Sequence, residues 1–135
     1  MKKYIVMVSS AMLLAACAVP PPQEESTQWK EYFSSENAIA FVDMNTKIWD
    51  VAGEGLKTSS ILINYPNVDA QGTHSAIMPF ALDCKNEMVK IESFTTYDQL
   101  DGQGNIITRN EAPEEGFLPL DSFLSGDKIH ALICN

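Results

Sequence analysis

An apolar run at the start of the chain constrains its fold more than any other feature, because it takes the first residues out of that fold. Lys2 and Lys3 give a positively charged start, and residues 4–16 are an almost unbroken run of aliphatic and small side chains. A helix that spans a bilayer needs about 20 apolar residues, so this run is too short to span one. It is typical of a secretory signal peptide. We therefore expect residues 1–16 to be removed and the rest to fold as one exported domain.

The apolar run ends in Leu14-Ala15-Ala16-Cys17, which is similar to a bacterial lipobox. In that motif the cysteine is acylated through its sulfur and becomes the new N-terminus. Two or more acyl chains anchor a protein stably in a membrane, whereas a single chain binds only marginally. The sequence therefore predicts lipidation at Cys17 and membrane attachment through it. The alternative is an ordinary signal peptide that is cut nearby, with Cys17 incidental to the cut.

The residues after Cys17 predict a destination and a spacer. By resemblance to enterobacterial lipoproteins, Ala18 in the place of an aspartate implies the outer membrane. Residues 20–22 are three consecutive prolines, which favour an extended, semi-rigid polyproline II segment. We interpret residues 17–27 as a lipidated tether and residues 28–135 as the folded domain.

The charge balance excludes one class of partner. Loss of residues 1–16 removes two lysines and no acidic residue, which leaves seven basic and 18 acidic side chains, a net charge of −11. Recognition of nucleic acid needs clustered lysine and arginine, so we expect no nucleic-acid partner. The same charge argues against a domain that lies flat on anionic lipid. Solubility is the simplest reason for this acidity.

Two cysteines remain once Cys17 is acylated. Cys84 and Cys134 lie 50 residues apart, in a compartment that permits disulfides. A disulfide that closes such a loop stabilises a domain by roughly 4 kcal/mol in the chain-entropy model. The competing interpretation is a pair of free thiols or metal ligands, but two cysteines without a CxxC spacing or adjacent histidines make a poor zinc site. We predict a Cys84–Cys134 disulfide.

Most of the remaining sequence has the pattern of β-strands. Turn-forming residues separate segments that are rich in β-branched and aromatic side chains, and a polar Gly-rich turn at 101–105 predicts a tight hairpin. Pro79 cannot donate a ladder hydrogen bond, so its strand must lie at an edge or carry a bulge there. Residues 29–33 fit a helix or a strand equally well. The segments expected as strands are 38–43, 47–51, 59–65, 75–84, 87–97 and 106–108.

The end of the chain has helical periodicity instead. After a loop over residues 113–119, Ser125 or Asp127 can cap a short helix in which Ile129, Leu132 and Ile133 recur at helical spacing. That apolar stripe would face the sheet and bring Cys134 to Cys84. The predicted fold is therefore α+β: a single antiparallel β-sheet of about six strands with a C-terminal helix packed on it, closed by one disulfide.

The sequence contains no catalytic motif such as GxSxG, HExxH or a phosphate-binding loop. His74 and His130 could act as general bases, but ordinary structural or surface roles are simpler. Asp83, beside the disulfide cysteine, could be a buried catalytic carboxylate or a structural hydrogen-bond acceptor. We therefore predict that the protein is not an enzyme and that it uses no cofactor.

Two further groups of side chains have a functional and a structural interpretation. Asp98, Asp101 and Asn105 gather oxygen ligands that could hold calcium, although their spacing does not match the EF-hand loop and such turns are common in hairpins. We therefore predict no metal site. The aromatic side chains could anchor a partner or pack in the core; they are Trp29, Tyr32, Trp49 and Tyr65.

With these residues placed, the chain resembles the surface-adhesin protein E family of bacterial lipoproteins. The Asp83-Cys84 pair with a partner cysteine at the C-terminus is the most specific shared feature. The other shared features are Trp29, an aromatic-rich segment that ends in Asp43, Ser75 at the start of a strand, a hairpin with Gly102 and Gly104, and the segment 119–125 before Cys134. The resemblance implies a small antiparallel sheet with a helix near the C-terminus.

The resemblance also implies a function and its partners. Family members bind host extracellular-matrix or serum proteins such as laminin and vitronectin, some of them as a homodimer, and a well-studied member uses basic residues for this. This chain departs from that pattern, because its cationic residues are few and scattered, so no ligand-binding residue can be carried over. They are Lys30, Lys47, Lys57, Lys85, Lys90, Arg109 and Lys128.

We therefore expect an outer-membrane lipoprotein that acts as an adhesin-like surface binding protein. The alternative is a periplasm-facing lipoprotein that inhibits or neutralises an enzyme such as a lysozyme or a toxin. The acidic charge suits that alternative, because lysozymes are basic and opposite potentials favour association. Exposure at the cell surface distinguishes the two functions.

Overall fold

A computed structural model describes residues 27–48, 55–111 and 116–135. The predicted signal peptide at 1–16, the predicted lipidation at Cys17, nearly all of the tether and Trp49 lie outside the described residues. Among the described residues, no helix combines the length and the apolar character that crossing a membrane requires.

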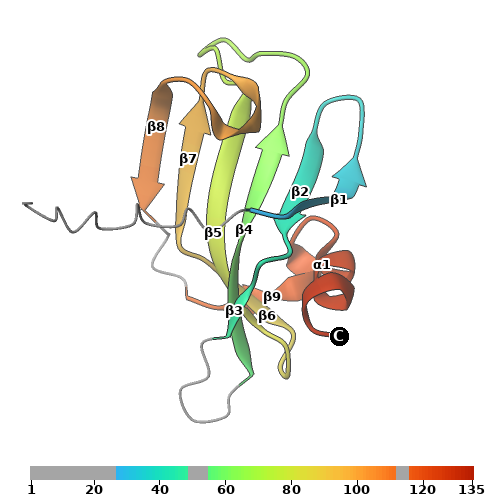
Figure 1. Cartoon of the computed structure of the whole chain (residues 1–135). Helices are drawn as coiled ribbons and strands as arrows, with labels where there is room; N and C mark the ends of the chain where they lie inside the picture. Colours follow the sequence, from blue (N-terminus) through green and yellow to red (C-terminus); the bar gives the residue numbers. More distant parts are fainter. Residues whose placement is uncertain (1–26, 49–54, 112–115) are drawn as a thin grey trace, which may run out of the picture.

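The described residues form nine β-strands, two short 3-10 helices and one α-helix (Figure 1). In chain order they are β1 (Trp29–Ser34), β2 (Ile39–Asp43), β3 (Lys47–Ile48), β4 (Leu56–Asn64), β5 (Ser75–Asp83), β6 (Met88–Ile91), β7 (Ser93–Tyr97), η1 (Leu100–Gly102), β8 (Ile106–Glu111), β9 (Leu118–Pro119), η2 (Leu120–Ser122) and α1 (Gly126–Ile133). The predicted α+β class is confirmed, but the expected number of about six strands is too low.

The sheet is antiparallel throughout and is built on one long ladder. β4 and β5 pair along their whole length, from Leu56↔Asp83 to Asn64↔Ser75. On the outer side of β4, β2 pairs with its second half and β3 with its first half, and β1 lies beyond β2. On the outer side of β5, β7 pairs with its first half and β6 with its second half. On each side of the ladder, one strand thus pairs with its first half and another strand with its second half.

Pro79 explains the change of partner beside β5. Phe80 of β5 pairs with β6 and Ile77 of β5 pairs with β7, and two residues of β5 lie between them. The segment that faces β5 has three residues between its two paired positions. The extra residue makes a β-bulge, where the Glu92 N–H donates to the Pro79 carbonyl at 2.9 Å. In a β-strand, the N–H and the carbonyl of one residue point to the same side. The position of the N–H that Pro79 lacks therefore faces this bulge. The bulge is confirmed, the edge-strand alternative is wrong, and the single strand expected over 87–97 is two strands.

The division gives the molecule two ends. We call β7, η1 and β8 the hairpin end, and β6, β9, η2 and α1 with the disulfide the helix end. Figure 1 shows them toward opposite ends of the long ladder, since β7 pairs with the first half of β5 and β6 with its second half. Among the described strands, β8 pairs with β7 alone and β9 with β6 alone. Residues 29–33, whose pattern left helix or strand open, form the edge strand β1.

The main core lies between the sheet and α1. Val42 and Ile61 form one cross-strand pair and Leu82 and Val89 another, so these side chains project from the sheet toward the same core. The helix contributes Ile129 and Ile133 as predicted, and Leu132 packs partly against the core. The fully assembled cluster is Tyr32, Ala40, Val42, Ile61, Phe80, Leu82, Val89, Leu120, Ile129 and Ile133.

The start of α1 is a close contact rather than a capped end. Ser125 precedes the helix with a φ of 51°, and its side chain makes no capping hydrogen bond. At Gly126 an added Cβ would lie 2.1 Å from the Leu120 carbonyl oxygen. Glycine therefore lets the first turn of α1 sit directly against η2, and the predicted cap by the Ser125 or Asp127 side chain is wrong.

The disulfide ties α1 to the end of β5. Cys84 and Cys134 are bonded, with 5.6 Å between their Cα atoms. The predicted bond is confirmed, and the alternative of free thiols or metal ligands is wrong. The C-terminal residues are thereby held against the turn between β5 and β6.

Candidate functional site

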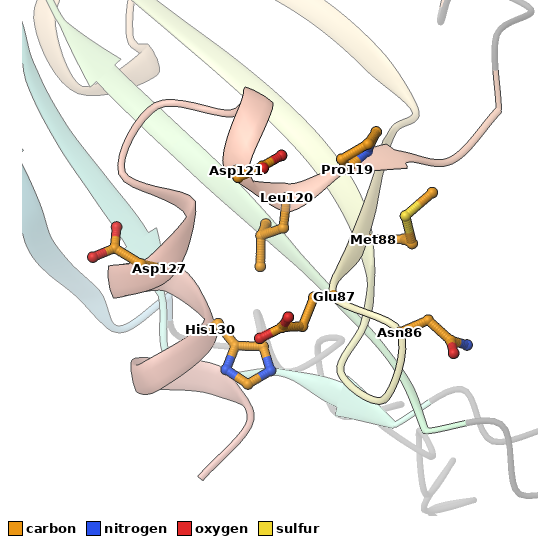
Figure 2. A pocket seen from close by; sticks show the side chains of 8 residues that line it. All are labelled: Asn86, Glu87, Met88, Pro119, Leu120, Asp121, Asp127 and His130. Carbon is orange, nitrogen blue, oxygen red and sulfur yellow. The ribbon is translucent and has the colours of Figure 1, made fainter.

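A pocket of about 420 Å³ lies at the helix end, between α1, η2 and the turn that joins β5 to β6. Figure 2 shows its lining side chains. The turn and β6 supply Asn86, Glu87 and Met88. β9 and η2 supply Pro119, Leu120 and Asp121, and α1 supplies Asp127 and His130. We call this cavity the His130 pocket.

Asp83 shapes the turn that forms one wall of the His130 pocket. Its carboxylate accepts hydrogen bonds from the Asn86 side-chain amide at 2.8 Å, from the Asn86 N–H at 2.9 Å and from the Lys85 N–H at 3.1 Å. The Asn86 side chain, and then these two N–H groups, hold the pKa of Asp83 below its ordinary value. Asp83 is a structural hydrogen-bond acceptor at the surface of the turn, and the idea of a buried catalytic carboxylate is wrong.

Glu87 is held at the pocket by its backbone. Its φ of 53° lies in the left-handed region, which a residue with a side chain adopts rarely. The Glu87 carbonyl accepts a hydrogen bond from the Leu120 N–H at 2.9 Å, which fixes the turn against η2. In Figure 2 the Glu87 carboxylate is directed toward the His130 ring.

His130 is oriented by the backbone of Cys84, one of the two disulfide-bonded cysteines. Its Nε2 lies 3.1 Å from the Cys84 carbonyl oxygen, which can only accept, so Nε2 is the protonated nitrogen. His74 lies near the hairpin end, where its Nδ1 is 3.3 Å from the Tyr65 carbonyl oxygen. The structure therefore does not bring the two histidines together.

The His130 pocket combines an apolar floor with a negative rim. Met88, Pro119 and Leu120 are apolar, whereas Glu87, Asp121 and Asp127 are carboxylates, and the described lining residues include no lysine or arginine. Within the described residues, none of the three carboxylates has a side-chain hydrogen bond or an ion pair. The rim therefore presents unneutralised negative charge to solvent.

Sequence reasoning missed every pocket residue except His130 and Asp127, and gave neither of them a binding role. Glu87 and Asp121 carry no local motif, because they belong to segments more than 30 residues apart. The β6–β9 pairs Met88↔Pro119 and Val89↔Leu118 bring the segments together. Residues 118–119 lie in the segment that the sequence predicts as a loop.

The residues weighed as calcium ligands hold the hairpin end together instead. Asp98 accepts from the Asn105 N–H at 2.7 Å and from the Asn105 side-chain amide at 2.9 Å, and Asp101 accepts from the Asn64 side chain at 2.7 Å. The Asn105 side chain, and then its N–H, lower the pKa of Asp98. Over residues 27–48, 55–111 and 116–135, no three His, Cys, Asp or Glu side chains gather as metal ligands would.

The described aromatic side chains differ in their surroundings. Tyr32 is in the core with 6 % of its surface exposed, and burial raises its pKa to about 12. Trp29 is half-buried at the start of β1. The pKa of Tyr65 is raised by burial and then by the charge of Asp69. Core packing is thus confirmed for Tyr32. Phe117 and Leu118, which lead into the pocket at Pro119, are instead about two-fifths exposed, at 39 % and 40 %.

Comparison with known proteins gives a family and a fold. The family model described as surface-adhesin protein E matches residues 29–135. Three structures of Haemophilus influenzae protein E, a selenomethionine form, crystal form II and a further one, each have 19 % identity, a TM-score of 0.55 and coverage of 86 % of this chain. They are covered over 92 %, 94 % and 90 % of their own lengths. A comparison with curated proteins found no match.

Proposed function

Because the chain belongs to the surface-adhesin protein E family, we propose that it is an outer-membrane lipoprotein whose domain binds a host matrix or serum protein at the cell surface. The observation that carries this proposal is the family match over residues 29–135, which is the whole predicted domain apart from its first residue. The family consists of surface-associated adhesins rather than enzymes. Laminin and vitronectin are the first partners to test.

The proposed anchor is the acylated Cys17. Its position directly after a signal-like apolar run supports the anchor, and the prolines at 20–22 would hold the domain away from the membrane. A Cys17→Ser variant is the matched test. It should leave the cells and appear in the soluble fraction, whereas the unchanged protein stays with the outer membrane. Retention of the variant on the outer membrane would contradict a lipid anchor at this residue.

Protease shaving of intact cells tests exposure at the surface. Immunodetection should show loss of the mature domain while a periplasmic control protein stays intact. Full protection of the domain, in cells whose outer membrane is sealed, would overturn the adhesin proposal. The net charge of −11 in the mature chain and the negative rim of the His130 pocket would then favour the periplasm-facing inhibitor of a basic enzyme.

Adhesion of whole cells tests the partner class. Cells that carry the full chain should bind immobilised laminin or vitronectin more than cells that lack the gene. The Cys17→Ser strain is the control, because it produces the domain without holding it on the cell. Equal adhesion of all three strains to both proteins would remove these two partners.

A further inference from the structure

From the shape and charge of the His130 pocket, we infer that it receives a lysine or arginine side chain of the protein partner. The inference deepens the proposed function and rests on it, in that the occupant belongs to a bound protein. The cationic head group would lie among Glu87, Asp121 and Asp127. The aliphatic stem would lie on Met88, Pro119 and Leu120.

The cavity is large enough to admit such a side chain, and its lining suits both parts of it. Its volume of about 420 Å³ lies within the range of ~300–1,000 Å³ that small-ligand sites occupy. Lysine and arginine are amphipathic, with an apolar stem and a charged head. A pocket with an apolar floor and carboxylates at its rim offers a surface to both parts at once.

Charge complementarity selects a cation over other occupants. Within the described residues, the three rim carboxylates have no partner of their own, and no lysine or arginine lines the cavity. Lys57 donates its Nζ to the Ile133 carbonyl near the end of α1 at 2.6 Å and is thereby occupied. Lys128 lies on α1 and Lys85 lies in the turn before Asn86, but neither is among the described side chains that line the cavity. An anionic or neutral occupant would leave the rim charges uncompensated.

The walls of the pocket are fixed before any partner arrives. The Cys84–Cys134 disulfide ties α1 to the turn, and the bond between His130 and the Cys84 carbonyl holds the imidazole beside it. The bond from the Leu120 N–H to the Glu87 carbonyl closes the third side. A site whose groups are already ordered loses less conformational entropy on binding.

The surface beside the pocket can extend the contact. Phe117 and Leu118 are exposed and lead directly into Pro119 on the pocket wall. An interface of this kind, with a seated cationic side chain and apolar neighbours, resembles the arrangement in which arginine acts as a binding hot spot. The occupant is therefore expected to be a basic residue flanked by apolar residues.

A titration of the mature lipidated protein in detergent micelles tests the inference. The probe is N-acetyl-arginine amide, and the matched control ligand is N-acetyl-citrulline amide, which has nearly the same shape without the charge. Backbone amide chemical shifts should move at Asn86, Glu87, Asp121 and Asp127 with the arginine probe and stay in place with citrulline. Equal shifts with both ligands would overturn the selection by charge.

Charge-neutralising variants locate the binding. Asp127→Asn together with Glu87→Gln should weaken the arginine probe about tenfold or more, because a charge-assisted hydrogen bond contributes about 1.5–3 kcal/mol and 1.4 kcal/mol is tenfold. Glu111→Gln on the distant strand β8 is the matched control and should leave affinity unchanged. Unchanged affinity in the pocket variant, with a native amide spectrum, would overturn the site; so would shifts spread over the whole acidic surface.

The two proposals fail separately. If protease shaving finds the domain protected but the arginine probe still binds, the pocket stands and the partner is a periplasmic protein with an exposed basic residue. If cells adhere to laminin or vitronectin but the Asp127→Asn and Glu87→Gln variant adheres equally well, the surface function stands and the pocket is not its binding site.

Discussion

The helix end and the hairpin end rest on the same β4–β5 ladder, but different interactions hold them. At the helix end, α1 buries Ile129 and Ile133 against the sheet, and the Cys84–Cys134 disulfide closes the structure. The hairpin end has instead a network of side-chain hydrogen bonds: its strand β8 is exposed at five of six residues. Apolar burial contributes more per residue than exposed polar contacts, so stability is concentrated at the helix end.

The hydrogen bonds of the hairpin end specify register rather than add much stability. Thr96 and Thr108 share a hydrogen bond of 2.7 Å across the β7–β8 pair. Asp98 closes the turn on Asn105. The candidate site lies at the other end, where a covalent bond and a packed core hold its walls.

Removal of the disulfide should have the largest effect on this contrast. Replacement of both Cys84 and Cys134 by serine should lower the free energy of unfolding by roughly 4 kcal/mol, because a loop of 50 residues is no longer closed in the unfolded chain. Urea unfolding followed by tryptophan fluorescence measures the loss. A loss smaller than that of any hairpin-end variant would contradict the conclusion that stability is concentrated at the helix end.

Truncation of the helix core should have the next largest effect. Ile129 is 1 % exposed, and Ile129→Ala should lower the free energy of unfolding by about 3 kcal/mol through lost burial and a cavity. Leu132→Ala is the matched control on the same helix, where the side chain is only partly buried, and it should lose clearly less. Equal losses in the two variants would show that α1 is loosely packed.

Ser75 is the strongest test of the hairpin end. Its buried hydroxyl donates to the Gln99 carbonyl and accepts from the Gly102 N–H at 2.9 Å, which ties η1 to β5. Ser75→Ala should lower stability by about 2 kcal/mol, since two hydrogen bonds of about 1 kcal/mol each are lost. Amide hydrogen exchange should speed up first in residues 98–105. Ser60→Ala, on the neighbouring strand of the same ladder, is the control; faster exchange across α1 as well would mean that the two ends are not separate.

The pH dependence should give the smallest effect. The hydrogen bonds from Asn105 lower the pKa of Asp98 in the folded protein, so its contribution is fully present above the unfolded value of about 3.9 and is lost as pH falls through the folded pKa. Urea midpoints measured from neutral to acid pH report this loss of stability. In Asp98→Asn the midpoint should fall less as the pH is lowered. Asp83, with a lowered pKa at the helix end, gives the parallel variant Asp83→Asn. A wild-type acid profile in both variants would contradict the role of these carboxylates.

Local patterns were sufficient for several elements. The runs at 59–65 and 75–84 are apolar and β-branched between turn residues, and they became β4 and β5 with boundaries shifted by a few residues. The Gly-rich turn at 101–105 does join two paired strands, and the apolar spacing of Ile129 and Ile133 does mark the buried side of α1. In each case the deciding signal lies within a few consecutive residues.

Other features had no local signal. The segment 87–97 has one continuous strand pattern, and only its pairing with Pro79 shows where it breaks. The segments 38–43 and 47–51 read as successive strands joined by a turn, yet β2 and β3 both pair with β4 and not with each other. Which strands pair is decided by the whole sheet, and the sequence alone left it open.

By itself, the sequence determined the disulfide, the antiparallel β character, the hairpin and the C-terminal helix, because each depends on residue type and short-range spacing. The tertiary structure alone decided the register at Pro79, the division into two ends and the His130 pocket. Glu87 and His130 line the same pocket only because the disulfide and the β6–β9 pairing bring together segments that are far apart in the chain. Such contacts depend on the packing of the complete domain, which no short stretch of sequence encodes.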